Sequence, residues 1–385
     1  MGPAHQPVKA RVIASANGAN TAAAGLGYDP STKRWVFART AADVAIPQLY
    51  KASSKESPVN GAWSHLLATY DAPTGALRLY VNGRLQQETS APIANAWKAT
   101  GPLTVGRSFL AGAAGGYFGG SLDHLQIWQR VLRPEEVLEL QAPRSSQGPV
   151  VTGDAAHWPL DTAVRGQDGI WRSRDTIRGA GFTIAGFQGS DQSKAFVSDA
   201  ERGKVLELTG ARRESVSLGH PVVDASASFS VAVMVKIADP TKPGVIIRQG
   251  SSTKDTWRLA YEPDGTTAKF TFARVNADTN TETVATSPIY DGDALDTWHL
   301  LVGTYHVDPR DPSNDRIELT MDLRSRDGSQ ASFAAPTRDG AVVVGKPGPT
   351  GTPFAGRLDD IRIYTGDLSP IKACQDYPGL EACGA

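Results

Sequence analysis

Phe118-Gly-Gly-Ser-Leu-Asp-His-Leu-Gln-Ile-Trp128 and Phe354-Ala-Gly-Arg-Leu-Asp-Asp-Ile-Arg-Ile-Tyr364 are two versions of one sequence pattern. In both stretches apolar and polar residues alternate after a phenylalanine and a glycine, as in a strand with one buried face. The two stretches lie 236 residues apart in a chain of 385 residues. This spacing indicates an internal repeat.

Three further pairs of segments occur in the same order at nearly the same spacing. Trp63-Ser-His-Leu-Leu-Ala-Thr-Tyr70 matches Trp298-His-Leu-Leu-Val-Gly-Thr-Tyr305, and Arg34-Trp-Val-Phe-Ala-Arg39 matches Lys269-Phe-Thr-Phe-Ala-Arg274. Upstream, Gly27-Tyr-Asp-Pro30 matches Ala260-Tyr-Glu-Pro263. All four pairs are separated by 233 to 236 residues, which predicts two copies of one domain.

The second copy has a long lead-in that the first copy lacks. It begins near Asp154 and includes Ser228-Phe-Ser-Val-Ala-Val-Met-Val235, whose alternation predicts a half-buried strand. About 85–90 residues ahead of Val8 would be needed to give the first copy the same strands. We therefore expect an N-terminally incomplete domain at residues 1–140, a polar linker at 141–153 and a complete domain at 154–385.

Composition and charge narrow the class of protein. Short β-branched and aromatic runs separated by abundant glycine and proline predict an all-β chain with many turns. The formal net charge of −1 gives no electrostatic basis for binding nucleic acid. No apolar run reaches the roughly 20 residues of a membrane helix, so we expect no membrane insertion. Residues 1–8 show no signal-peptide pattern, and we expect any export signal to lie outside this chain.

Taken together, the repeated sequence segments resemble the laminin-G-like and pentraxin branch of the concanavalin A-like lectin/glucanase superfamily. The residues that carry the resemblance run from Trp63 to Asp71, Tyr80 to Gly83, Leu103 to Arg107 and Phe118 to Trp128, followed by Val137. The second copy departs from it where Met321-Asp-Leu323 replaces Val81-Asn-Gly83. The resemblance implies two tandem jelly-roll β-sandwiches, the first lacking its N-terminal strands. It also implies an extracellular adhesion, carbohydrate-binding or protein-binding module, with calcium at the rim in some relatives.

One acidic residue recurs inside the repeated strand, as Asp123 and Asp359. Strand parity places each carboxylate on the same face as the apolar residues that follow it, Leu125 and Ile127 or Ile361 and Ile363. A buried carboxylate needs a partner. We expect a structural role, with backbone N–H groups or a cation as that partner.

Calcium needs roughly six to eight oxygen ligands, so clustered acidic residues are the candidates. We consider three loops and hairpins as candidate sites. Their residues are Asp291, Asp293 and Asp296; Asp308, Asp311, Asn314 and Asp315; and Asp71 with Asn82. None of the three follows the EF-hand pattern, and solvated acidic turns are the alternative interpretation.

Aromatic residues outside the repeated strands are candidates for sugar stacking. Trp97 and Trp171 fit this description, and packing within loops or the core is the alternative. Four other tryptophans fall within predicted strands, where we expect core or sheet-face positions: Trp35, Trp63, Trp128 and Trp298. No paired-carboxylate strand pattern, nucleophile elbow or P-loop is present, which favours a non-catalytic protein.

The two cysteines, Cys374 and Cys383, would close a ten-residue loop at the end of the chain. We expect a disulfide, with two free thiols as the alternative. The sequence therefore predicts a pair of binding modules, extracellular or on a cell surface, for glycan or an extracellular protein. The alternatives are structural spacers of a large exported protein and a glycoside hydrolase of the same fold. We expect the first domain to be completed by a second polypeptide, by a swapped segment, or by residues outside this chain.

Overall fold

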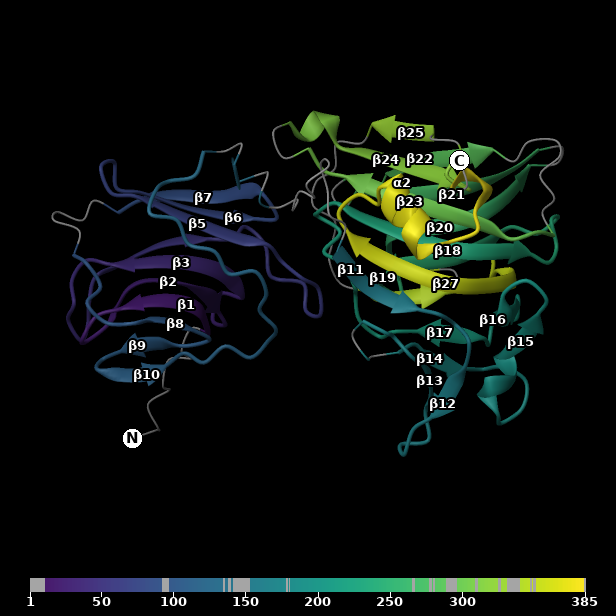
Figure 1. The fold of residues 1–385 in the computed structure, drawn as a ribbon, viewed down its shortest axis with the longest axis horizontal. Helices are drawn as coiled ribbons and strands as arrows, with labels where there is room; N and C mark the ends of the chain where they lie inside the picture. Colours follow the sequence, from purple (N-terminus) through teal and green to yellow (C-terminus); the bar gives the residue numbers. More distant parts are fainter. Residues whose placement is uncertain are drawn as a thin grey trace. The chain divides into compact units, whose positions relative to one another are not determined.

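The computed structural model describes residues 11–91, 97–133, 136–137, 140, 153–177, 179, 181–264, 267–276, 279, 281–288, 296–308, 311–324, 327–330, 340–346, 348 and 351–383. The chain divides into two compact units, one holding Met1–Pro58 with Ser64–Gln141 and the other Val59–Trp63 with Ala142–Ala385. The break after Gln141 falls in the predicted linker, most of which lies outside the described residues. Both units are built from antiparallel β-sheets (Figure 1).

The described part of the first unit contains a five-stranded, a three-stranded and a two-stranded sheet. The five-stranded sheet, in spatial order, consists of β4 (Leu49–Ser53), β3 (Arg34–Thr40), β2 (Ala22–Asp29), β1 (Arg11–Asn17) and β8 (Leu103–Val105). The three-stranded sheet consists of β5 (Leu66–Asp71), β6 (Ala76–Val81) and β7 (Arg84–Ser90), and the two-stranded one of β9 (Ser108–Leu110) and β10 (Ala113–Gly115).

Two larger sheets form the described part of the second unit. The eight-stranded sheet consists of β15 (Phe196–Asp199), β16 (Gly203–Thr209), β27 (Ala355–Thr365), β18 (Phe229–Ile237), β23 (His299–His306), β24 (Arg316–Met321) and β25 (Asp327–Gln330), with β11 (Gly153–Trp158) also paired to β27. The nine-stranded sheet consists of β12 (Ala163–Arg165), β13 (Trp171–Ser173), β14 (Thr183–Ala185), β17 (Ser215–Ser217), β26 (Ala341–Val344), β19 (Gly244–Gly250), β20 (Asp255–Asp264), β21 (Thr267–Val275) and β22 (Glu282–Pro288).

The main core of the second unit lies between these two sheets. Alternate side chains of β18, from Phe229 to Val235, enter it from the eight-stranded sheet. Trp257 and Phe272 enter it from the nine-stranded sheet and stack around Phe229, with ring centres 5.6 and 6.2 Å from the Phe229 ring. This interdigitation of two inner faces is that of a β-sandwich, and it confirms the predicted all-β fold.

The outer face of the eight-stranded sheet is covered by the C-terminal segment. Helix α2 (Pro370–Asp376) lies across this face (Figure 1), and Tyr377 joins a second apolar cluster with Ala232 and Met234 of β18. The prediction that β18 is half-buried is therefore wrong, because its second face is covered as well. Ser369 caps the helix and Pro370 occupies its first turn. The predicted disulfide joins Cys374 to Cys383.

The two units repeat one arrangement of strands. Ala14 of β1 pairs with Val105 of β8, and Ile247 of β19 pairs with Val344 of β26 at the matching position. Strands β1 to β7 therefore correspond in order to β19 to β25. In the described residues the first unit has no counterpart of β11 to β18, and residues 121–128 form no strand. Strands in those positions are therefore described for the second unit only.

Candidate binding surface

A group of polar and aromatic side chains gathers on the outer face of the eight-stranded sheet, beside the part covered by α2. It comes from the β15–β16 hairpin, the start of β23 and the first half of β27. We call it the Trp298 cluster, and its members are Asp199, Arg202, Glu207, Trp298, Arg357 and Asp359.

The β15–β16 turn positions two members of the cluster. Asp199 ends β15, and its carboxylate accepts backbone N–H bonds from Glu201 at 3.0 Å and from Arg202 at 3.3 Å. Gly203 follows with φ of 80°, a conformation that suits glycine. The turn is therefore tight, and it directs Arg202 across the sheet toward β23 and β27.

Arg202 connects an aromatic ring to a buried carboxylate. Its guanidinium lies 5.6 Å from the centre of the Trp298 ring, and its Nε donates to Asp359 Oδ2 at 2.5 Å. The Trp298 Nε1 donates to Asp199 Oδ1 at 3.1 Å. The indole is partly buried against the outer apolar cluster, so its orientation is fixed from two sides.

Arg357 provides the more exposed edge of the cluster. Its guanidinium lies 3.1 Å from Asp199 Oδ2 and 3.1 Å from Glu207 Oε1. Arg357 and Glu207 are both substantially exposed at the side chain, whereas Asp199 is almost fully buried. The cluster therefore presents planar charged donors and acceptors to solvent around a fixed indole.

Burial and hydrogen bonding give the two buried carboxylates, Asp199 and Asp359, different pKa values. Burial raises the pKa of Asp359 to about 6, because its cost to the charged form outweighs the attraction of Arg202. Burial also acts to raise the pKa of Asp199, but hydrogen bonds from the Glu201 backbone and from Trp298 and Arg357 outweigh it, and that pKa is lowered. Asp199 is thus a permanent anion at neutral pH, while Asp359 titrates near pH 6.

Comparison with known proteins identifies the family. Residues 1–138 and 210–372 match the model of the concanavalin A-like lectin/glucanases superfamily, which together is more than half of the chain. The chain belongs to this superfamily. No curated protein sequence matches it.

Several solved structures resemble the chain at low sequence identity. Domain 4 of AbnA, an extracellular arabinanase from Geobacillus stearothermophilus solved with arabinotriose, has a TM-score of 0.41 and 18% identity, covering 58% of this chain and 98% of that one. The CBM40 of a Ruminococcus gnavus sialidase has a TM-score of 0.33 and 14% identity, covering 43% and 91%. The receptor-binding domain of botulinum neurotoxin type G has a TM-score of 0.39 and 12% identity, and only 50% of that chain is covered.

A bulge in β27 corrects the predicted orientation of Asp359. Asp360 has φ of 44°, and the pairing with β18 shifts register there, so Asp359 lies opposite Met234 on the outer face. Ile361 and Ile363 still enter the main core. The parity prediction is wrong because one extra residue reverses the alternation.

The bulge also anchors the C-terminal segment of this concanavalin A-like domain. The Asp360 carboxylate accepts from Arg362 Nε at 2.9 Å and lies 2.7 Å from His157 Nε2 of β11. Its carbonyl accepts the Tyr377 hydroxyl at 2.9 Å. Arg362 in turn lies 3.2 Å from Asp376 of α2. These contacts give this carboxylate a structural role.

Where the structure describes the predicted acidic loops, several of their polar side chains hydrogen-bond within the loop. Asp315 is fully buried and accepts from the Tyr305 hydroxyl at 2.9 Å and from the Asp308 backbone at 2.8 Å. Asp311 accepts from Ser313, and Asn314 donates to Asp308. These hydrogen bonds give Asp315, Asp311 and Asn314 a part in holding the loop. Asp296 is exposed, and Asp291 and Asp293 lie outside the described residues.

The first-unit candidates have local roles. Asp71 accepts from Thr74 Oγ1 at 2.7 Å within the β5–β6 turn. Asn82, with φ of 50°, accepts the His65 N–H at 2.9 Å. Asp322, with φ of 51°, accepts the Leu300 N–H at 2.8 Å at the matching position of the second unit. The described residues hold no group of three His, Cys, Asp or Glu side chains placed to bind a metal.

The predicted aromatic platforms pack locally. Trp97 is partly buried and donates from Nε1 to the Thr40 carbonyl at 3.0 Å. Trp171 packs against the main core of the second unit. Asp123 is exposed beside His124. Sequence reasoning missed Asp199, Arg202 and Glu207, because the described part of the first unit has no counterpart of the β15–β16 hairpin and the repeat therefore gave no signal. It missed Arg357 because the first unit has Ser121 at the matching position.

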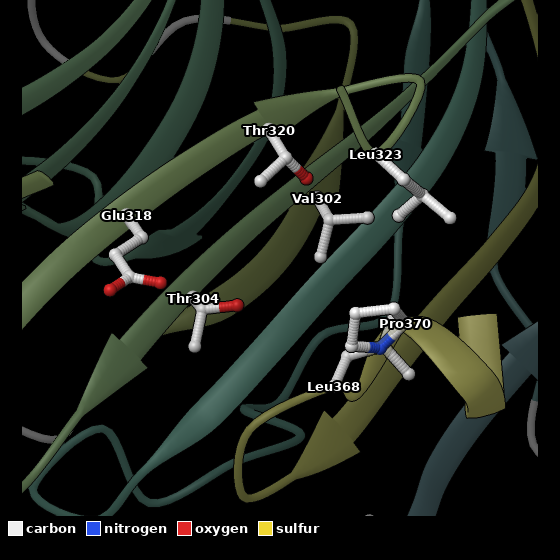
Figure 2. A pocket seen from close by; sticks show the side chains of 7 residues that line it. All are labelled: Val302, Thr304, Glu318, Thr320, Leu323, Leu368 and Pro370. Atoms are coloured by element: carbon white, nitrogen blue, oxygen red, sulfur yellow. The ribbon is translucent and has the colours of Figure 1, made fainter. Parts of the chain in front are cut away.

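A small pocket lies elsewhere on the outer face of the same sheet. Figure 2 shows its lining side chains converging from β23, β24 and the segment before α2. They are Val302, Thr304, Glu318, Thr320, Leu323, Leu368 and Pro370. Its volume of about 30 Å³ holds a water molecule rather than a sugar ring.

Proposed function

We propose that the second unit is a non-catalytic carbohydrate-binding module and that the Trp298 cluster is its sugar-contacting surface. The observation that carries this proposal is the partly exposed indole of Trp298, fixed between Arg202 and Asp199. A sugar ring binds to such a site by placing C–H groups on the aromatic face and hydroxyl groups against charged planar side chains. Arg357 and Glu207 supply exposed donors and acceptors beside the ring.

The state of the carboxylates supports binding without cleavage. Glycoside hydrolysis requires two carboxyl groups that face each other across the bond to be broken. Asp359 has the raised pKa of a general acid, but Arg202 holds it and its side chain is only 7% exposed. We assign it to positioning Arg202. The disulfide and the absence of a membrane-spanning helix among the described residues fit an extracellular module.

Affinity electrophoresis of the full chain through gels containing individual polysaccharides tests the proposal, followed by titration calorimetry with oligosaccharides of the retarding polymer. We expect Trp298→Ala to weaken binding at least tenfold. Arg357→Ala and Glu207→Ala, at exposed positions that tolerate change, should weaken binding severalfold. Trp171→Phe is the matched aromatic control and should bind as the unaltered chain does.

These experiments test the proposed function and the proposed binding surface separately. If no polysaccharide retards the chain, the proposal of carbohydrate binding is wrong. That result would favour the alternative role as a structural spacer. If binding occurs but Trp298→Ala, Arg357→Ala and Glu207→Ala all bind normally, the site is wrong. Chromatography of the oligosaccharides after incubation should show no shortened products, and their appearance would overturn the non-catalytic assignment.

A further inference from the structure

The first unit contains a pocket beside the end of β1 and the start of β8. Its lining residues come from segments 17–18 and 102–109, and they include Asn17, Gly18, Thr104, Arg107 and Phe109. The volume of about 110 Å³ lies between the roughly 30 Å³ share of one water molecule and the roughly 150 Å³ of a cavity that holds benzene. The pocket therefore has room for a small planar group.

A buried polar network holds the lining residues of this pocket in place. Asn17 is only 2% exposed, and its side-chain amide donates to the Pro102 carbonyl at 2.8 Å and to Thr104 Oγ1 at 2.9 Å. Asn17 Oδ1 accepts the N–H of Phe109 at 3.2 Å. Because these bonds connect both lining segments, the pocket is formed before any ligand arrives.

In the second unit an arginine side chain occupies the matching place. Ser15 of β1 and Arg248 of β19 are at equivalent positions in the register of the two units. Ser15 Oγ lies 3.1 Å from the Arg107 carbonyl. Arg248 Nε donates to the equivalent carbonyl, that of Lys346, at 3.2 Å, and its Nη1 donates to the Ser251 carbonyl at 3.1 Å. The pocket thus results from a short side chain on a strand that both units possess.

The charges around the pocket disfavour a cation in the place of that guanidinium. Arg248 pairs with Asp255 at 2.8 Å, but Ala22 stands at the position of Asp255 in the first unit. Asp43, the carboxylate beside Gly18, already accepts three backbone N–H bonds at 2.8 to 3.0 Å. The exposed side chain of Arg107 adds a positive charge at the pocket. A neutral planar group therefore suits this pocket better than a cationic one.

The pocket offers an acceptor, a donor and an apolar surface to such a group. Gly18 is equivalent to Ser251, whose carbonyl faces the arginine in the second unit, and the Gly18 carbonyl accepts no hydrogen bond from another described residue. The guanidinium of Arg107 supplies N–H donors, and the Phe109 ring supplies the apolar surface. An acetamido group, which is planar and neutral, has the N–H, the carbonyl oxygen and the methyl group that match these three features.

We propose that this pocket binds the acetamido group of an N-acetylated sugar. The amide N–H donates to the Gly18 carbonyl, the amide oxygen accepts from Arg107, and the methyl group contacts Phe109. An acetylated lysine carries the same group on a methylene chain, but the exposed Arg107 beside the pocket suits the hydroxyl groups of a sugar ring. This site belongs to the first unit and does not depend on the function proposed for the Trp298 cluster.

Saturation-transfer NMR tests the proposal with the full chain and the methyl glycosides of N-acetylglucosamine and N-acetylgalactosamine. The chain carries Trp298→Ala, so that sugar held by the Trp298 cluster does not contribute and failure here leaves the proposed function untouched. We expect at least one of the two glycosides to bind, with the strongest transfer at its acetyl methyl group. Methyl glucoside and methyl galactoside, which lack the acetamido group, should bind at least tenfold more weakly. Transfer to Nε-acetyl-lysine methyl ester alone would overturn the proposal.

Variants in the same background test the position. Ser15→Arg combined with Ala22→Asp recreates the ion pair of the second unit and should weaken binding of the acetylated glycoside at least tenfold by filling the pocket. Ser90→Arg, at an exposed serine of β7, is the matched control and should leave binding unchanged. Circular dichroism checks that each variant is folded, and Arg107→Ala, at an exposed position, gives a second test with a severalfold loss expected. Absence of binding by both acetylated glycosides, or unchanged binding in the folded pocket variants, overturns the proposal.

Discussion

Arg274 lies with its guanidinium 3.7 Å from the centre of the Tyr305 ring, in the core of the second unit. Arg39 and Tyr70 repeat this contact at the matching position of the first unit, at 4.2 Å. Arg274 is fully buried, whereas Arg39 is partly exposed. The same pair of residues therefore exists in a closed and in an open sandwich.

Because Arg274 is buried and Arg39 is partly exposed, replacing each by lysine should change the free energy of unfolding by different amounts. Lysine lacks the planar group that stacks on an aromatic ring. We expect Arg274→Lys to lower the free energy of unfolding of the second unit by roughly 2 kcal/mol, as for a desolvated cation–π contact. Arg39→Lys should lower that of the first unit by less than about 1 kcal/mol. Urea unfolding followed by hydrogen exchange of each unit measures both, and equal effects would contradict the prediction.

The raised pKa of Asp359 predicts a pH dependence of stability. The folded protein keeps this proton up to about pH 6, whereas the unfolded chain releases it near 3.8. Stability should therefore fall as the pH rises through this window, by about 3 kcal/mol in total. Asp359→Asn cannot titrate. We expect its free energy of unfolding, relative to the unaltered chain, to rise between pH 4 and 6 and to level off above. A constant difference across that range would show that Asp359 titrates normally.

His306 also has a raised pKa, but its contribution to stability is present at low pH and depends on the charged form. The hydrogen bond that His306 donates from Nδ1 to Asp367 Oδ2, 2.6 Å away, raises the pKa of His306 above 6.5. The pair stabilises the fold fully below pH 6.5, and this contribution is lost as the pH rises through the raised value. His306→Gln should lower the melting temperature more at pH 5.5 than at pH 9. The expected loss at pH 5.5 corresponds to about 1 kcal/mol for a partly exposed pair.

Removing the disulfide should loosen the segment that covers the outer face. The Cys374–Cys383 bond closes a short loop, which corresponds to roughly 2–3 kcal/mol of loop entropy in the unfolded chain. We expect the Cys374→Ser/Cys383→Ser variant to melt at a lower temperature and to exchange amide protons faster in α2. The main core should stay protected, so fast exchange throughout β18 would contradict this separation.

Part of this structure could be predicted from the sequence. The repeat and the strand periodicity predicted two sandwiches, because both are carried by short segments of neighbouring residues. The bulge at Asp360 could not be predicted, since one residue at positive φ reverses the face of Asp359 without changing the pattern. The Trp298 cluster could not be predicted either, because its contacts join residues 99 and 157 positions apart.

The position of strand β27 late in the chain affects how the second unit folds during synthesis. It pairs with β11, β16 and β18, all of which leave the ribosome long before it. Until residue 365 has emerged, these strands have no common partner and their edges remain open to other nascent chains. Closure of this sheet therefore depends on contacts distant in sequence, and such folds form slowly and expose aggregation-prone edges meanwhile. We expect the second unit to acquire its native structure only once synthesis has passed this last strand, and to need chaperone protection until then.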